Sequence, residues 1–293
     1  IAVGGLANVA EGGMLGISIG GLANVAEGGM NGISVGGLAN VSEGVVSGIT
    51  LGGLANVAEG GMTGISFGGL ANVSEGGMRG ISIGGLANVS EGGMSGISIG
   101  GLANVSEGRM SGISIGGLAV VTGDGPISGL TVGGLAVAAL EAPISGITAS
   151  AGSITGAELS GITLGGIGMV SMEEIDARHI AYSGIRAGSA RWITAHGFDI
   201  DIADDLTGFA ASGIRIHAER IAGLAASLIV SSGEMRGLSI GGVNYTSALQ
   251  VGLSIGIVNY TERLKGLQFG LVNIARNNTK PFRVLPILNA HFD

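Results

Sequence analysis

A 16-residue unit repeats along the first part of the chain, and this period constrains the fold more than any other feature. Reading from Gly16, successive units are GISIGGLANVAEGGMN, GISVGGLANVSEGVVS and GITLGGLANVAEGGMT. Two drifted copies, which begin at Gly112 and Gly129 and are each one position longer, follow the near-identical ones. A fixed period of this kind indicates a repeat architecture, in which each unit packs only against its neighbours.

Each unit alternates short apolar segments with paired glycines. The segment Ile17-Ser18-Ile19 alternates as a half-buried strand does, and Gly20-Gly21 supplies the freedom of a sharp corner. Helix is disfavoured, because Gly costs about 1 kcal/mol relative to Ala inside a helix. The sequence therefore predicts an all-β fold, a single elongated parallel β-solenoid with one coil for each 16-residue unit.

The same pattern leads us to expect an apolar interior. The columns that begin at Ile17, Ile19 and Leu22 would stack inside from coil to coil, and the hydroxyl column that begins at Ser18 would face solvent. The methionine column that begins at Met14 is expected to pack at a corner of the coil, because Met fills irregular gaps readily.

Four segments differ in how strictly they repeat. Residues 1–146 hold the regular repeats, including the two longer copies, and residues 147–236 are predicted to form degenerate, irregular coils. Residues 237–280 return to a tighter repeat, whose units begin at Gly237, Gly252 and Gly266 and are shorter than the first units by one or two positions. Residues 281–293, which match no repeat, are expected to form a C-terminal cap.

Two polar residues recur in every regular unit and predict ladders along the solenoid. Stacked Asn amides stabilise by bonding from coil to coil, whereas stacked carboxylates repel. We expect the Glu row to splay into solvent, with a row of weak Ca²⁺ sites as the functional alternative. The Asn ladder comprises Asn8, Asn24, Asn40, Asn56, Asn72, Asn88 and Asn104, and the Glu ladder comprises Glu11, Glu27, Glu43, Glu59, Glu75, Glu91 and Glu107.

Composition and charge exclude several classes of protein. There is no Cys and hence no disulfide scaffold, and charged residues make up 12% of the chain. The net charge of −8 argues against nucleic acid as a partner. Residues 1–120 are acidic, whereas residues 236–293 hold six Lys or Arg against two acidic residues, a net charge of +4. Opposite charge at the two ends favours head-to-tail contact between copies.

Few residues suggest chemistry, and we predict that the chain is not an enzyme. An acidic cluster, Asp199, Asp201, Asp204 and Asp205, is the candidate metal site, for Ca²⁺, although no EF-hand pattern surrounds it. No cofactor is otherwise expected. Residues 173–220 are the one plausible catalytic or glycan-binding region, and the single Trp192 there is expected to pack at a coil junction, with stacking on a sugar as the alternative.

The C-terminal segment GLSIGIVNYTERLKGLQFGLVNIARNNTKPFRVLPILNAHFD resembles the tails of uncharacterised bacterial Gly-rich surface-repeat proteins. Those tails carry GLxxGLVNxA units and end close to LPxxNAHF, and the GGLANVSEG array resembles the repeats that precede them. The resemblance implies export and an extracellular or outer-surface location in a bacterium. It implies no enzyme activity and no catalytic residues.

These observations predict a structural cell-surface or extracellular repeat protein that self-assembles end to end into a filament or fibre. The regular first coils show no evident cap, which indicates that end as the docking surface. One alternative is a monomeric surface adhesin or carbohydrate-binding module that uses residues 173–220. Another is an outer-membrane-associated β protein, and contact with the cell envelope or with glycans is a further expected partnership.

Overall fold

The computed structural model confirms the predicted parallel β-solenoid. The fold is all-β, with 76% of the chain in strands and no helix among the described residues. The structure describes residues 1–181 and 184–292, except the side chains of residues 172, 173, 175–181 and 193. The chain forms two compact units, Ile1–Ala157 (unit 1) and Glu158–Asp293 (unit 2), which are treated separately below.

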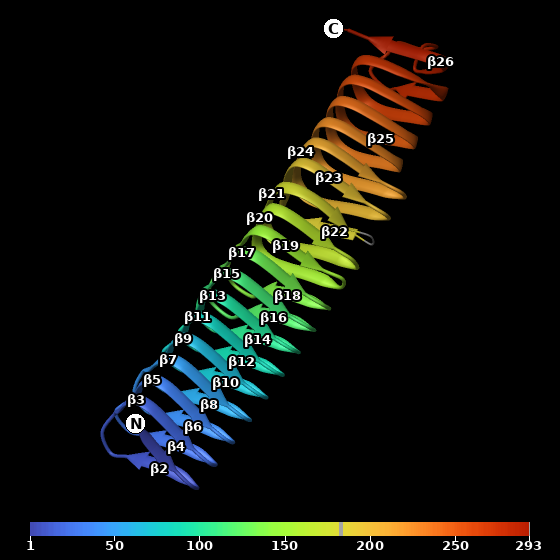
Figure 1. Cartoon of the computed structure of the whole chain (residues 1–293). Coiled ribbons are helices and arrows are strands. Elements are labelled where there is room, and N and C mark those ends of the chain that lie inside the picture. The colour runs from blue at the N-terminus through green and yellow to red at the C-terminus, as the bar shows by residue number, and fades with distance from the viewer. Residues whose placement is uncertain (182–183, 293) are drawn as a thin grey trace. The chain divides into compact units, whose positions relative to one another are not determined.

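Unit 1 alternates a seven-residue strand with a four-residue strand, and the two together make one coil (Figure 1). The longer strands are β3 (Met14–Gly20), β5 (Met30–Gly36), β7 (Val46–Gly52), β9 (Met62–Gly68), β11 (Met78–Gly84), β13 (Met94–Gly100), β15 (Met110–Gly116), β17 (Ile127–Gly133) and β19 (Ile144–Ser150), preceded by the short β1 (Ala2–Gly4). The shorter strands are β2 (Ala7–Ala10), β4 (Ala23–Ala26), β6 (Ala39–Ser42), β8 (Ala55–Ala58), β10 (Ala71–Ser74), β12 (Ala87–Ser90), β14 (Ala103–Ser106), β16 (Ala119–Thr122) and β18 (Ala136–Ala139).

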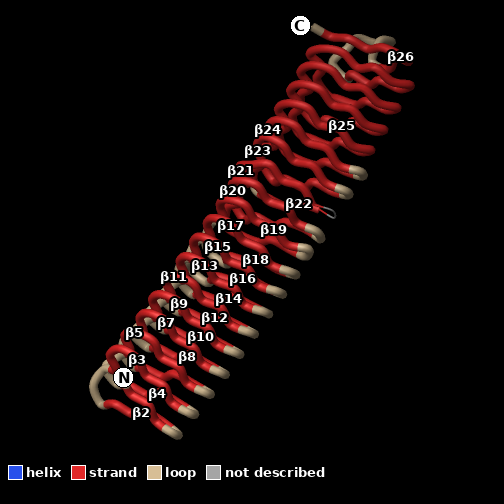
Figure 2. The backbone as a smooth tube through the Cα atoms, viewed as in Figure 1, coloured by secondary structure: helices blue, strands red, loops and turns tan. Residues whose placement is uncertain are grey.

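Every strand of unit 1 pairs in parallel with its counterpart in the next coil, so equivalent residues stack in columns. Met78 of β11 lies beside Met94 of β13, and Asn72 of β10 beside Asn88 of β12, each offset by one repeat. The two longer copies keep this alignment, since β15 pairs with β17 from Met110↔Ile127 onward. Figure 2 shows that loops are confined to the corners of unit 1, which is where the additional residue is accommodated.

The orientation of the strands corrects the sequence-based expectation about the coil interior. Ile17, Ile19 and Leu22, predicted to be inside, are 36%, 42% and 46% exposed, whereas Ser18, predicted to be outside, is 2% exposed. The interior holds Met, Ser or Thr, Gly, Asn and Ala, and the outer surface carries the Ile, Leu and Val columns. The Met column is packed inside, as predicted, with Met78 only 1% exposed.

Two features explain this reversal: side chains alternate between the two faces of each strand, and each coil encloses little space. Asn24 is fully buried in the ladder, so strand alternation turns Val25 outward and Ala26 inward. A Cβ on Gly20 would lie 2.1 Å from the carbonyl oxygen of Ala23, which shows how little room the coil encloses. The regular coils therefore fill this interior with Ser, Thr, Ala, Asn and Met, and the drifted coils bury Val120, Ile127, Val137 and Ile144 in the same columns.

A second glycine column sets the shape of the longer strand. Gly80 of β11 has a φ of +107°, and a Cβ there would lie 2.3 Å from the carbonyl oxygen of Gly64. The column requires both a left-handed backbone and close approach between coils, so Gly is the residue that satisfies it without strain.

Unit 2 is also built of parallel coils, with longer strands and less uniform spacing than those of unit 1. Its strands are β21 (Gly168–Ala181), β22 (Gly184–Ala187), β23 (Ser189–His196), β24 (Asp199–Ser212), β25 (Arg215–Ala275) and β26 (Val284–His291), while β20 (Ser153–Gly165) begins in unit 1 and ends in unit 2. Gly168 pairs with Gly184 at the spacing of the regular repeat, whereas Gly184 pairs with Asp199 at a spacing one position shorter. These are the irregular coils predicted for this part of the chain.

The 61-residue strand β25 winds through several coils, because its corners remain hydrogen-bonded. Its left-handed glycines show the winding: Gly223, Gly237, Gly252 and Gly266 each approach the glycine one coil earlier in the chain. The capping strand β26 then runs antiparallel to the last coil, pairing Gly266 with His291. The open backbone edge of that coil is therefore covered, as the predicted C-terminal cap requires.

Candidate functional site

The outer apolar columns of unit 1 are its most distinctive surface. The leucine column of the Gly-Gly corner is nearly uniform in exposure, between 45% and 46% from coil to coil. It comprises Leu22, Leu38, Leu54, Leu70, Leu86, Leu102 and Leu118. Ordinary soluble monomers rarely expose contiguous apolar surface beyond a few hundred Å². A leucine ridge repeated through seven successive coils therefore indicates a contact surface.

An apolar groove lies beside this ridge, at the same corner of the coils. The groove has a volume of about 490 Å³, and the side chains of Val35, Leu51, Phe67 and Ile83 line it together with paired glycines of successive coils. None of the lining residues is charged. The leucine column and the lining of the groove therefore repeat with the same period from coil to coil.

The Asn ladder holds this face in register from inside. Asn24, Asn40, Asn56, Asn72, Asn88 and Asn104 are all fully buried. Each amide nitrogen before Asn104 donates to the amide oxygen of the next Asn at 2.8–2.9 Å, and also to a main-chain carbonyl of the next coil, such as that of Ile83 for Asn72. Asn8, which is partly buried, begins the series with a bond to Asn24.

The ladder ends where the sequence drifts. Asn104 lies beside Val120, so its Nδ2 donates instead to the hydroxyl of Ser114 at 3.1 Å and to the carbonyl of Ile115. Apolar residues continue the column, with Val120 beside Val137. In unit 2 a second ladder links Asn244, Asn259 and Asn273, with amide-to-amide distances of 2.7 Å.

The Glu row lies on the outside, at the corner that follows each shorter strand. Glu11, Glu27, Glu43, Glu59, Glu75, Glu91 and Glu107 are all exposed. The carboxylates are thus free to splay into solvent, which limits the repulsion between neighbours. Among the described residues, no group of three or more potential metal ligands gathers closely enough to hold an ion, in this row or elsewhere.

The four aspartates predicted as a metal site lie on unit 2 and face cationic residues of adjacent coils. Asp199 pairs in register with Arg215, and Asp201 lies between Arg186 and His217. Asp199, Asp201, Arg186 and Arg215 line a pocket of about 290 Å³. Asp199 and Asp201 alternate with the buried Ile200 and Ile202 and thus lie on the outward face of β24, together with these arginines.

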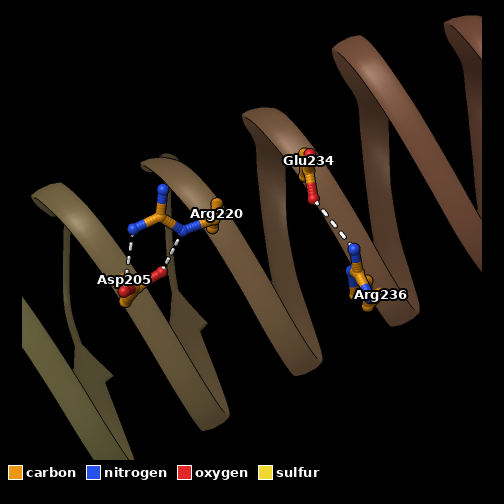
Figure 3. A network of polar contacts seen from close by, with 4 residues as sticks. All are labelled: Asp205, Arg220, Glu234 and Arg236. Carbon is orange, nitrogen blue, oxygen red and sulfur yellow. Dashed lines mark hydrogen bonds and ion pairs between the residues drawn. The ribbon is translucent and has the colours of Figure 1, made fainter.

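Asp205 forms the shortest ion pair among the described residues. The Arg220 guanidinium donates from Nε to Oδ1 at 2.5 Å and from Nη2 to Oδ2 at 2.9 Å, and Figure 3 shows this bidentate pair beside the Glu234–Arg236 pair. The hydrogen bond from Arg220 lowers the pKa of Asp205. Asp204 is exposed, and its backbone amide bonds to the carbonyl of Gly188. The cluster thus includes a coil-to-coil ion pair.

Trp192 departs from the sequence-based expectation that it packs at a coil junction. Its side chain is 68% exposed, and its φ of +76° lies in the left-handed region. Trp192 aligns with Gly208, so it occupies the column that glycine fills in other coils. The neighbouring Arg191 pairs with Glu174 at 3.0 Å. The side chains of Glu173 and Asp176, in the region predicted for catalysis or glycan contact, lie outside the described residues.

Two tyrosines stack on the outer face of β25. The rings of Tyr245 and Tyr260 have centroids 5.1 Å apart and are nearly parallel, at 10°. The hydroxyl of Tyr260 donates to Glu262, and this bond raises the pKa of Tyr260. The pair replaces the outward Val column of unit 1 with a polar-tipped aromatic surface.

Comparison of the chain with family models, with curated proteins and with solved structures found no match. None of the described residues forms a helix long and apolar enough to cross a membrane. The fold therefore defines the class of protein, a β-solenoid repeat protein, and the regular coils of unit 1 carry apolar columns on their outer surface.

Sequence analysis missed these outer columns as a functional surface. A signal was present, because an Asn ladder inside the coil forces Val25 outward by alternation, and the Gly-Gly corner then leaves Leu22 exposed as well. The expectation that Ile and Leu are internal outweighed that signal.

Proposed function

We propose that the chain is a structural repeat protein that self-associates side by side through the ridge and groove of unit 1. The observation that carries the proposal is the leucine ridge beside an uncharged groove, repeated with one period along successive coils. A second copy has the same period, so its ridge can enter the groove at every coil. Such a face can pair with itself about a two-fold axis, as in an isologous interface.

The lateral contact differs from the end-to-end contact predicted from the sequence. That expectation assumed polar sides, since it placed Ile and Leu inside the coils. The observed exterior instead exposes apolar columns along the sides of unit 1, where burial contributes about 25 cal/mol per Å². The exposed Glu row lies at the opposite end of each shorter strand from the leucine ridge, where like charges oppose a second mode of packing.

The location we propose, the outer surface of a bacterial cell or its exterior, depends on the resemblance of the C-terminal segment to surface-repeat proteins. A role in building a surface layer or fibre is consistent with dense, small-residue coils and with the absence of a recognisable catalytic motif in the sequence. End-to-end assembly into a filament remains a prediction from the sequence. Lateral pairing neither requires nor excludes it.

Sedimentation across a concentration series tests the proposal. The unchanged chain is expected to form dimers or larger species, whereas a double Leu70→Lys, Leu86→Lys variant is expected to remain monomeric because its charges cannot be buried in an apolar groove. The matched control is Thr63→Arg, since Arg79 already occupies that outer column one coil away. Association that survives the double variant would contradict the proposal.

Trp192 favours a second candidate function, contact with glycans. A bulky residue in the left-handed region costs about 1–3 kcal/mol, and such strain concentrates at functional sites. An exposed indole offers a flat apolar face for stacking on a sugar ring, and its location falls in the region predicted for glycan contact. Binding to a glycan panel that is lost in Trp192→Gly would support this candidate, and binding that is unchanged in that variant would contradict it.

A further inference from the structure

Unit 1 contains two basic residues, Arg79 and Arg109, and both of them break the repeat. Arg79 stands in a column that holds Thr63 in the preceding coil and Ser95 in the following one. Arg109 stands at a position that is glycine in the two preceding units. The two arginines thus belong to different columns and to coils that are not adjacent, yet they line the same pocket.

The pocket spans three successive coils at the corner that holds the Glu row. Its volume is about 160 Å³. Arg79 comes from the first of these coils and Arg109 from the third, and the lining includes Gly92 and Gly93 of the coil between them. At a strand spacing of about 4.8 Å, the first and third coils are about 10 Å apart. Two long arginine side chains at this separation can reach one ligand.

Neither arginine is neutralised within the chain. Among the described residues, no carboxylate forms an ion pair with the guanidinium of Arg79 or of Arg109. Glu75, Glu91 and Glu107 are exposed at this corner but do not line the pocket. Both arginines are exposed as well, so the N–H donors of their guanidinium groups are available to a ligand from solvent.

The number of donors indicates which kind of anion fits. A carboxylate presents two oxygens, which the fork of one guanidinium can satisfy. Two forks that come from separate coils favour an anion with more acceptor oxygens, such as a phosphate or sulfate group. The hydroxyls of Ser95 and Ser111, which also line the pocket, can donate further hydrogen bonds. A tetrahedral oxyanion therefore fits this pocket better than a Glu side chain of a second copy does.

We propose that this pocket binds a tetrahedral oxyanion, a phosphate or sulfate group, through Arg79 and Arg109. The rest of unit 1 repels such an anion, because residues 1–157 hold eight Glu and one Asp against these two arginines. Binding is thus confined to the place where the two cations lie together. The leucine ridge lies at the other corner of the coils, so the site does not depend on the self-association proposed for unit 1.

Calorimetric titration of the full chain with inorganic sulfate, at constant ionic strength, tests the proposal. One sulfate is expected to bind per chain, and acetate is expected to bind about tenfold more weakly or less, because it fills one fork only. No binding of sulfate, or binding of acetate with the same Kd, would overturn the proposal.

Parallel titrations with inorganic phosphate and with a hexose 6-phosphate distinguish the source of the group. A lower Kd for the hexose phosphate would indicate a group carried on a sugar, and equal values would indicate the free ion. Either result supports an oxyanion site, whereas failure of both ligands to bind would contradict it.

Variants that restore the repeat locate the binding. Arg79→Ser and Arg109→Gly each introduce the residue that a neighbouring coil holds at the same position, so the coils should fold unchanged. Each is expected to raise the Kd for sulfate by about tenfold or more, and the double variant is expected to abolish binding. The matched control, Arg236→Ser, removes a positive charge from unit 2 and should leave the Kd unchanged. Unaltered binding by the double variant, or equal weakening by the control, would overturn the assignment.

Discussion

Unit 1 and unit 2 build the same kind of coil with different degrees of uniformity. In unit 1 an Asn column runs without interruption from Asn8 to Asn104, then changes to Val at Val120 and Val137. In unit 2 the equivalent column begins as Met169 beside Ile185 and changes back to Asn at Asn244. Along this column, Asn residues therefore occur in consecutive coils and apolar residues in others, because a single buried amide among apolar neighbours would lose its hydrogen bonds.

The ends of these runs show the direction of the ladder. Each Nδ2 donates toward the C-terminus, so the first Asn of a run lacks a donor for its Oδ1, and the last Asn needs another acceptor. The buried Oδ1 of Asn244 has no partner among the described residues. Asn104 is the last Asn of its run, and its Nδ2 donates to the hydroxyl of Ser114 in place of a next Asn. In the Asn column of unit 1, the residue type thus changes only at such a boundary.

The largest effect is expected where both units require a left-handed glycine. A Cβ on Gly223 would lie 2.0 Å from the carbonyl oxygen of Gly208, and φ there is +136°. Gly223→Ala is expected to cost roughly 3–5 kcal/mol in the free energy of unfolding. Gly80→Ala in unit 1 should cost a similar amount. Denaturant unfolding measures both, with Gly184→Ala as control, since its nearest neighbour would lie 3.4 Å away. Similar stability for all three variants would contradict the shared requirement.

The next effect separates the middle of an Asn run from its end. Asn56→Val removes one of the two acceptors of the Asn40 Nδ2, which still donates to the carbonyl of Leu51, and leaves the Oδ1 of Asn72 without its donor, at about 1–3 kcal/mol for each group. Asn104→Val only moves the existing boundary by one coil, so it should cost about 1 kcal/mol. Chemical denaturation compares the two, and equal losses would show that the ladder is not cooperative.

A stabilising substitution distinguishes Trp192 from the glycines of its column. Trp192→Gly is expected to raise the free energy of unfolding by about 1 kcal/mol, because it relieves a left-handed backbone at a side chain with little packing. Trp192→Ala keeps a Cβ and should show a smaller gain. Thermal unfolding of the three proteins measures this. Destabilisation by Trp192→Gly would mean that the indole contributes to folding.

The smallest effect concerns pH and the ion pair of unit 2. The pKa of Asp205 is lowered in the folded state, so its contribution is present above the ordinary Asp pKa and is lost as pH falls through the lowered value. The effect should be slight, since both side chains are about half exposed. Asp205→Asn should remove that part of the acid sensitivity and leave the stability of unit 1 unchanged. An unaltered acid profile in the variant would show that the pair contributes nothing.

The sequence predicted the fold from period, alternation and paired glycines, since a 16-residue unit with Gly corners has few ways to fold. It did not predict which face lies inside, because hydrophobicity alone assigns Ile17 to the core and Ser18 to solvent. The signal for the opposite orientation was the Asn ladder, whose position inside the coil turns Val25 outward by alternation. The strained Trp192 and Ile287 were likewise unpredictable, as neither residue type signals a left-handed backbone.

The reversed orientation of the strands is the central claim, and thiol labelling tests it directly because the chain contains no Cys. Ile49 and Thr50 are adjacent in β7, at 38% and 1% exposure. In dilute solution, the Ile49→Cys variant is expected to react rapidly with a maleimide, and the Thr50→Cys variant is expected to react only after unfolding. Rapid labelling at position 50 with protection at position 49 would contradict the account.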